Sequence, residues 1–158
     1  MQKLEVLGGK KLRGQVDISG SKNASLPILA ATILSDEKIC LTNIPKVKDI
    51  ETMVNLLKSI GSNIKRDSKK KSLSITNNKK LKFFAPYNLV KTMRAGILVL
   101  GPMLARFHKA KVSLPGGCSI GTRPIDIHLN CLSKLGVDYK ISNGYVYASA
   151  SNGLVGAR

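Results

Sequence analysis

The sequence has no tryptophan, only three phenylalanines and four tyrosines, and nine acidic residues against 26 basic ones. With 43% apolar residues it can still build a core, made of Leu, Ile, Val and Ala rather than of large rings. It also lacks a long apolar run, because Gly96, Gly101 and Pro102 interrupt the longest one, at residues 95–105. About 20 apolar residues are needed to span a bilayer. We therefore expect a soluble chain of 158 residues without a membrane segment, forming one domain or a piece of a larger one.

The sequence offers little for metal or disulfide chemistry. Its three cysteines and two histidines show no metal-ligand spacing, and the cysteine number is odd (Cys40, Cys118, Cys131, His108, His128). We expect no metal site and no cofactor. Residues 1–20 alternate polar and apolar side chains, so no secretory signal is predicted, and a reducing, cytoplasmic location is favoured. Cys40 and Cys131 are interpreted as small buried hydrophobes. For Cys118, a structural and a reactive role both stay open.

The formal charge of +17 raises the question of nucleic acid. Eight of the 26 basic residues lie between Lys65 and Lys82, in a polar stretch typical of a hairpin tip. Such charge runs are usually solvated faces, and no aromatic side chains are interleaved in this one for base stacking. We therefore expect no nucleic-acid partner. A field that attracts small anionic substrates is the alternative use of the charge.

The pattern of apolar residues predicts one structural unit and then repeats it. Alternation in residues 1–19 predicts strands. The first unit has a helix at 24–34 with Asn23 as N-cap and Pro27 in its first turn, a strand at 39–42, a helix at 48–60 stopped by Gly61, and strands at 63–65 and 72–76. The second has a long helix from 87 towards 106, kinked at Pro102, a strand at 111–114, a helix at 125–135 stopped by Gly136, and strands at 138–141 and 145–148.

The two units are related by a period of about 75 residues, which aligns residues 56–61 with 131–136. The strands at 39–41 and 112–114 match at a spacing of 73, so the second unit has two extra residues in the loop that contains Cys118. The first helix of each unit is apolar nearly all round and must be buried on every side. We therefore predict an α/β fold of helix–strand–helix–strand–strand units, with helices inside and sheets outside.

Three segments are suited to bind anions or to move protons. Residues 19–23 (SGSKN) precede a helix whose free N–H groups, with Lys22, suit a phosphate or carboxylate. Residues 115–124 (PGGCSIGTRP) form a glycine-shaped loop in which Arg123 favours the thiolate of Cys118. Arg94 is a lone cation before an apolar stretch and is suited to bidentate anion binding. A capped helix start or an exposed charge is the alternative interpretation of Lys22 and Arg94. Asp49 and Asp126 each stand at a predicted helix start, and for Asp49 we favour a capping role.

Together these segments resemble one family closely. Residues 14–24 (GQVDISGSKNA), 85–95 (APYNLVKTMRA) and 114–121 (LPGGCSIG) resemble motifs of the UDP-N-acetylglucosamine 1-carboxyvinyltransferases. The sister enzyme that makes enolpyruvylshikimate phosphate shares the fold and the glycine-serine-lysine opening, but not the Pro-Gly-Gly-Cys loop. The resemblance implies an incomplete inside-out α/β barrel-type domain, with two of three repeat units present.

The resemblance also implies an activity. Such enzymes transfer the enolpyruvyl group of phosphoenolpyruvate to the 3′-hydroxyl of UDP-N-acetylglucosamine and release phosphate, the first committed step of peptidoglycan synthesis, on which cell wall, cell shape and cell division depend. By resemblance, Cys118 is the proton donor, can form a covalent adduct and is the target of fosfomycin. Two further groups of residues follow from the same motifs: Lys22 and Asn23 bind phosphoenolpyruvate, while Arg94, Arg123, Pro124, Ile125, Asp126 and Ile127 bind the UDP-sugar.

The family's members are much longer than this chain. The resemblance assigns residues 1–21 to strands of the other domain, 22–84 and 85–150 to the two repeats, and 151–158 to the start of the next segment. The general base falls in the absent part, so we expect the isolated chain to be inactive unless a C-terminal domain is supplied in cis or in trans. Two alternatives stay open: a non-catalytic remnant or half of a split enzyme, and a basic nucleic-acid-binding module.

Overall fold

The computed structural model describes residues 3–77, 80–116 and 124–157. Its first repeat contains α1 (Lys22–Ala31), the 3-10 helix η1 (Thr32–Leu34), β1 (Ile39–Leu41), α2 (Lys48–Ile60), β2 (Ser62–Asp67) and β3 (Ser72–Asn77). Its second repeat contains β4 (Phe84–Ala85), α3 (Tyr87–Val90), the 3-10 helix η2 (Arg94–Val99), α4 (Leu100–Phe107), β5 (Lys109–Ser113), α5 (Asp126–Lys134), β6 (Asp138–Ser142) and β7 (Tyr145–Ser149). The predicted α/β class and the repeated order of elements are confirmed.

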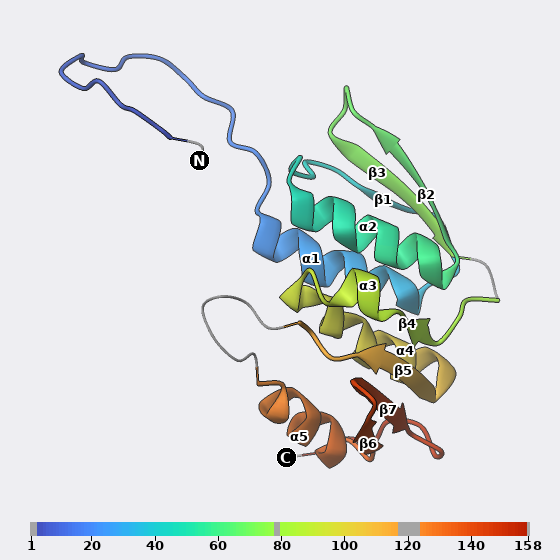
Figure 1. Cartoon of the computed structure of the whole chain (residues 1–158). Helices are drawn as coiled ribbons and strands as arrows, with labels where there is room; N and C mark the ends of the chain where they lie inside the picture. The colour runs from blue at the N-terminus through green and yellow to red at the C-terminus, as the bar shows by residue number, and fades with distance from the viewer. Residues whose placement is uncertain (1–2, 78–79, 117–123, 158) are drawn as a thin grey trace.

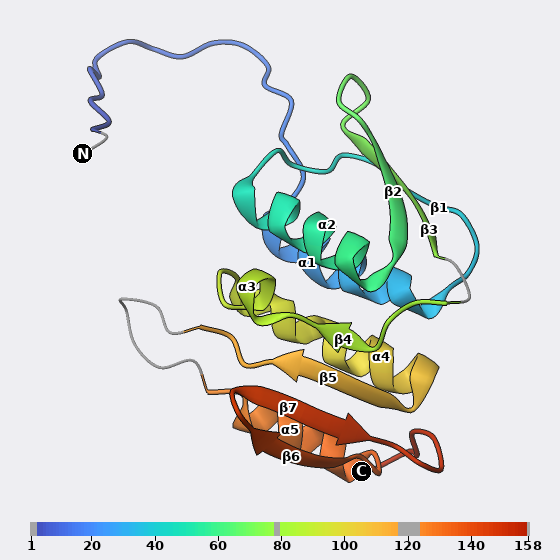
Figure 2. The same ribbon diagram turned by 45° about the vertical axis from the view of Figure 1, so that its right-hand side comes forward.

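Each repeat builds its own sheet with the same strand order. The first sheet runs β1-β3-β2, and the second runs β4-β5-β7-β6, in which β4 is the added strand and lies parallel to β5. All other pairings are antiparallel. Helices α1, α2 and α4 fill the space between the two sheets (Figures 1 and 2). The expected arrangement, with helices inside and sheets outside, is therefore observed.

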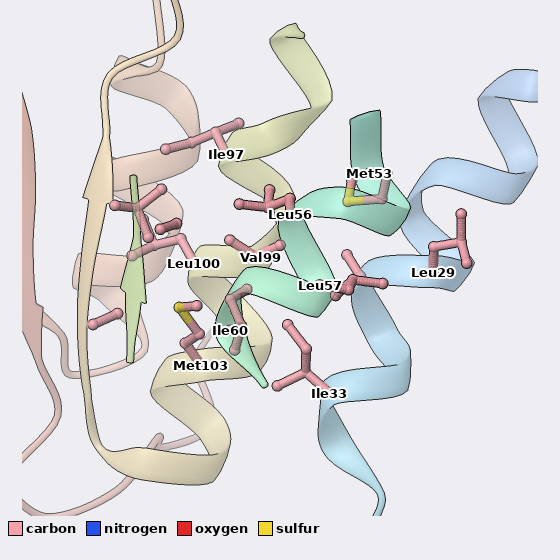
Figure 3. Close-up of a cluster of buried hydrophobic side chains, with 14 of the residues drawn as sticks. Leu29, Ile33, Met53, Leu56, Leu57, Ile60, Ile97, Val99, Leu100 and Met103 are labelled. Atoms are coloured by element: carbon pink, nitrogen blue, oxygen red, sulfur yellow. The ribbon is translucent and has the colours of Figure 1, made fainter. Parts of the chain in front are cut away.

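The core lies where these helices meet. Side chains of α1, α2 and the η2–α4 segment point toward one another in Figure 3, and the largest are fully buried: Leu29, Ile33, Met53, Leu56, Leu57, Ile60, Leu100 and Met103. Four of these residues, Met53, Leu56, Leu57 and Ile60, recur at helical spacing on α2, so the apolar stripe of α2 buries one whole face of the helix. Gly61 ends α2 with a φ of 118°, a left-handed conformation that favours glycine.

A partly buried polar network joins the two repeats at one edge of this core. The guanidinium of Arg106, on α4, donates to the Ile33 carbonyl at 2.5 Å and pairs with Asp36. The Asn77 side chain, on β3, donates to the carbonyls of Thr32 and Ser35 at 2.5 and 2.9 Å. Carbonyls at the end of a helix lack partners within the helix. A residue of the second repeat thus satisfies the end of the first repeat's helix.

Several local predictions are wrong. The alternating residues 1–19 form no strand in the part of the chain described here: residues 3–20 run away from the body (Figure 1), and Val16 and Ile18 are exposed. A strand needs a partner edge for its backbone groups, and none of the described strands pairs with this segment. Helix α1 begins earlier than predicted, so its N-cap is Ser21 instead of Asn23 and Pro27 lies inside the helix, past its first turn.

The long apolar helix predicted from residue 87 towards 106 is divided into three pieces. Helix α3 stops at Val90, and just after it the Thr92 hydroxyl donates to the Leu89 carbonyl at 3.0 Å. Pro102 does not kink a helix: it is the third residue of α4, where a missing N–H costs nothing.

Two predictions about side chains at the surface can also be judged. Cys40 and Cys131 are exposed, so the interpretation of both as buried hydrophobes is wrong. Cys40 occupies the outward position of β1, and Cys131 lies on a face of α5 that is not covered. The Lys-rich stretch does form the β2–β3 hairpin, and its described lysines are solvated as predicted. No helix in the described ranges has the length and apolarity to cross a membrane.

Candidate functional site

The N-termini of four helical segments meet at one open cleft of about 1110 Å³. Lys22 and Asn23 begin α1, Asp49 lies in the first turn of α2, Arg94 begins η2, and Asp126 begins α5. The first N–H groups of a helix have no partner within it, and the helix dipole places partial positive charge there. The cleft is therefore suited to ligands that carry several negative charges.

The first wall is built by the start of α1. The Ser21 hydroxyl caps the helix by accepting the Ala24 N–H at 3.3 Å. Gly20 is required just before it, because a Cβ there would lie 1.8 Å from the carbonyl oxygen of Asn43. The ammonium of Lys22 lies 2.9 Å from the Asp49 carboxylate, and both side chains are partly exposed. Asp49 lies in the first turn of α2, where its carboxylate supports the helix dipole as predicted; Val47 is the N-cap, and Asp49 also pairs with Lys22.

The second wall is the break between α3 and η2. It places Thr92, the buried Met93 and the exposed Arg94 along the cleft. In a continuous helix these three consecutive residues would point in different directions around the helix axis. Gly116, the second residue of the Cys118 loop, packs against this break. A Cβ on Gly116 would lie 2.5 Å from the Lys91 carbonyl oxygen, so only glycine fits this approach.

The third wall is the start of α5, which supplies the segment Pro124, Ile125, Asp126 and Ile127 together with two residues that the sequence did not single out for function. These are His128 and Cys131, which lie three residues apart and so share a face of the helix. Ile127 is 73% exposed, an unusual fraction for an apolar side chain at the mouth of a cleft.

His128 is the titratable group of the cleft that burial affects. Its Nε2 atom is buried and has no hydrogen-bond partner among the residues whose positions are described. Desolvation by burial lowers the pKa of the His128 imidazole below 6.5, since burial disfavours the charged form. The neutral imidazole is therefore the favoured state of this side chain near neutral pH.

The cleft brings together seven of the nine residues expected from sequence: Lys22, Asn23, Arg94, Pro124, Ile125, Asp126 and Ile127. Cys118 and Arg123 lie outside the described residues. Sequence reasoning assigned Asp49 to its helix only, and it missed the roles of Thr92, His128 and Cys131 in lining the cleft. The position of His128, three residues after the expected site residue Ile125 on the same predicted helix, was the available signal. Among described residues, no group of three His, Cys, Asp or Glu side chains could hold a metal ion.

Comparison with known proteins gives a consistent result. The family described as EPSP synthase (3-phosphoshikimate 1-carboxyvinyltransferase) matches residues 6–157. Among curated relatives, UDP-N-acetylglucosamine 1-carboxyvinyltransferase of Pelagibacter ubique is 70% identical over 99% of this chain. The proteins of the same name from a Sulfurovum species and from Pasteurella multocida are 53% and 51% identical over the whole chain. The chain spans 37% of the length of each of these relatives.

Solved structures agree on the fold. The enolpyruvyl transferase NikO from Streptomyces tendae superposes with a TM-score of 0.75 at 19% identity, over 91% of this chain and 31% of that one. EPSP synthase from Acinetobacter baumannii superposes with a TM-score of 0.51 at 22% identity, over 84% of this chain and 29% of that one. At these identities the likeness concerns the fold alone.

Proposed function

The chain belongs to the EPSP synthase family, and from this premise we propose that it serves an enzyme that transfers enolpyruvyl from phosphoenolpyruvate to the 3′-hydroxyl of UDP-N-acetylglucosamine. The observation that carries the proposal is the meeting of Lys22, Arg94 and the start of α5 at one cleft with four helix N-termini. Phosphoenolpyruvate brings a carboxylate and a phosphate, and the UDP-sugar brings a diphosphate. Cations and free N–H groups in this arrangement stabilise such anions.

The proposed roles follow the geometry of the cleft. Lys22 and Asn23, the first two residues of α1, bind phosphoenolpyruvate, while Arg94 and residues 123–127 hold the UDP-sugar across the cleft. The sugar hydroxyl attacks C2 of phosphoenolpyruvate and gives up its proton to a general base, while Cys118 delivers a proton to the methylene carbon. The resulting tetrahedral adduct loses a proton from the new methyl group, and cleavage of the bond between C2 and the phosphate oxygen releases phosphate. Cations around the phosphate stabilise the charge of the leaving group.

The proposal includes a partner for the chain. Because the chain spans 37% of its curated relatives, we assign the general base and further phosphate ligands to a C-terminal part that acts in cis or in trans. Closure of two domains excludes water and completes a site of this kind. We therefore expect the isolated 158 residues to release no phosphate above background when both substrates are present. Because the reaction begins peptidoglycan synthesis from nucleotide sugars, we place it in the cytoplasm.

Isothermal titration of the chain with UDP-N-acetylglucosamine and with phosphoenolpyruvate tests the cleft. We expect Arg94→Gln to weaken binding of the UDP-sugar, and Lys22→Gln that of phosphoenolpyruvate, each by roughly tenfold, since each removes a charge-assisted hydrogen bond. Lys70→Gln, on the solvated β2–β3 turn, is the matched control and should leave both affinities unchanged. Equal affinities for wild type and both cleft variants would contradict the proposal.

A second test addresses the thiol. Cys40 and Cys131 are both exposed, so a fosfomycin-type epoxide can reach them, and selective labelling of Cys118 would reflect activation of its thiol rather than access alone. We expect mass spectrometry to find the adduct on Cys118, with faster labelling when UDP-N-acetylglucosamine is bound. Equal labelling of the three cysteines would argue against a thiol tuned for proton transfer.

A further inference from the structure

The outward face of the second sheet carries aromatic and lysine side chains in alternation. Phe84 of β4 pairs in register with Lys111 of β5, Lys111 with Tyr147 of β7, and Tyr147 with Lys140 of β6. Residues paired across neighbouring strands point to the same face of a sheet. Val112 follows Lys111 on β5, Val146 precedes Tyr147 on β7, and both valines are buried. Since successive side chains of a strand point to opposite faces, this row of four faces away from the core.

The lysines of this face lie over the rings. The Lys111 ammonium is 5.3, 4.8 and 5.0 Å from the ring centroids of Phe84, Tyr145 and Tyr147. The Lys109 ammonium is 4.5 Å from the ring of Phe83, and the Lys140 ammonium is 5.8 Å from that of Tyr147. Four of the chain's seven Phe and Tyr rings therefore meet lysines on one side of one sheet.

An open groove of about 490 Å³ crosses this face. From this face it is lined by Phe83 and Tyr147, by Lys109, Lys111 and Lys140, and by one carboxylate, that of Asp138. It shares no lining residue with the cleft at the helix N-termini. The groove therefore combines ring faces with positive charge at a place that the proposed transfer reaction does not use.

The fold itself does not require these rings. Lysine stems that cover aromatic rings do stabilise an exposed sheet. However, the strands β1, β3 and β2 of the first sheet follow the same order as β5, β7 and β6 of the second, and none of the three contains an aromatic residue. Its outward row is Cys40, Ser74 and Lys65. The same architecture thus forms without an aromatic row, so ligand recognition is a reason for the row on the second sheet.

We propose that this face of the second sheet binds single-stranded nucleic acid, with bases stacked on its rings and phosphates paired with its lysines. Stacking on aromatic side chains along a basic groove is how such strands are held without sequence preference. An acidic peptide would use the lysines but not the rings. Free nucleotides usually bind in enclosed pockets that bury most of the ligand, whereas this groove is open along the sheet. The run from Lys65 to Lys82 has no interleaved rings, whereas folding brings rings and lysines together on the outward face of the second sheet.

Fluorescence anisotropy of the 158-residue chain with a labelled twelve-nucleotide oligouridylate, measured at several salt concentrations, tests the proposal. Tyr147→Leu and Phe84→Leu should each weaken binding by at least about fivefold without changing the salt dependence, because each removes a stacking surface. Lys111→Gln should reduce the slope of log K against log salt by about 0.7, the value for one phosphate contact of a single strand.

The controls separate stacking from charge alone. Tyr147→Phe keeps the ring and should bind like the wild type, which also guards against loss of folding in the Tyr147→Leu variant. Lys69→Gln, on the β2–β3 turn, removes a lysine that has no ring partner and should change the affinity less than about twofold. Absence of binding, or unchanged affinity in both ring variants, overturns the proposal. An oligoglutamate or uridine monophosphate that competes as well as the oligonucleotide overturns it too, in favour of an acidic peptide or a free nucleotide.

Discussion

Helices α2 and α5 occupy equivalent places in the two repeats but bury different fractions of their surface. In α2, Met53, Leu56 and Leu57 are all 0% exposed. The residues 75 positions later in α5 are His128, Cys131 and Leu132, of which only Leu132 belongs to the core. At these positions the first repeat therefore uses its second helix for packing, whereas the second repeat turns the same face of the equivalent helix to the cleft. The repeated order of elements forms the scaffold, and the copy of this helix with fewer apolar side chains lines the site.

The largest expected effect tests this difference at a matched pair of leucines. Leu57→Ala removes a fully buried side chain of α2 and should lower the free energy of unfolding by about 4 kcal/mol. Leu132→Ala, at the equivalent position of α5, should cost about 2 kcal/mol, because fewer atoms surround it and the site can relax. Urea titrations followed by circular dichroism measure both. Equal costs would show that α5 is packed as tightly as α2.

The next effect tests how the repeats are joined. Arg106 has a side chain only 13% exposed, and it donates to the carbonyl of Ile33 and pairs with Asp36 across the repeat boundary. Arg106→Met keeps most of the stem but leaves these acceptors without their partner, so we expect a loss of about 2 kcal/mol in the free energy of unfolding. Arg66→Met is the matched control. Arg66 lies 3.7 Å from Glu51 in a solvated pair, and its loss should cost less than about 0.5 kcal/mol.

The contrast between the repeats also shows what the sequence could predict of the fold. Helix α2 was predicted residue for residue, because a regular apolar stripe is closed by a glycine in the left-handed conformation. The segment from Tyr87 to Phe107 was predicted as one helix and is three. Hydrophobic periodicity cannot distinguish an α-helix from a 3-10 turn of similar composition.

The candidate site was predictable where it consists of helix starts and lone cations. Lys22, Arg94 and Asp126 all stand at the beginning of a helical segment, and such positions can be recognised from local pattern. The pairing of Lys22 with Asp49 and the exposure of Cys131 could not be predicted, because they depend on how separate helices pack against one another. Local spacing determines which residues share one face of a helix, and only tertiary packing determines what that face contacts.

A smaller effect concerns the ion pair that only the first repeat has. Asp49 pairs with Lys22, whereas the residue 75 positions later is Pro124. Because the pair is partly solvated, Asp49→Asn should change the free energy of unfolding by no more than about 1 kcal/mol. It also frees the Lys22 ammonium from a competing carboxylate, so phosphoenolpyruvate should bind roughly twofold or more tightly. Asp126→Asn is the control at another helix start. Weaker binding in Asp49→Asn would mean that the carboxylate mainly orients Lys22.

The smallest effect lies in the pH dependence of stability, at the position where the first repeat has Met53 and the second has His128. Burial lowers the pKa of His128 below 6.5, so below that pH the unfolded chain binds more protons than the folded one. The contribution of this side chain is therefore complete above about pH 6.5 and is lost as the pH falls toward the lowered folded-state pKa. His128→Met restores the side chain of the first repeat and should flatten the stability profile below pH 6.5, as urea titrations between pH 5 and pH 8 would show. His108→Asn controls for the removal of an imidazole elsewhere, on the exposed end of α4. If the profile flattens in His108→Asn but not in His128→Met, the wall of the cleft does not hold a neutral imidazole, and the two helices differ less than their burial indicates.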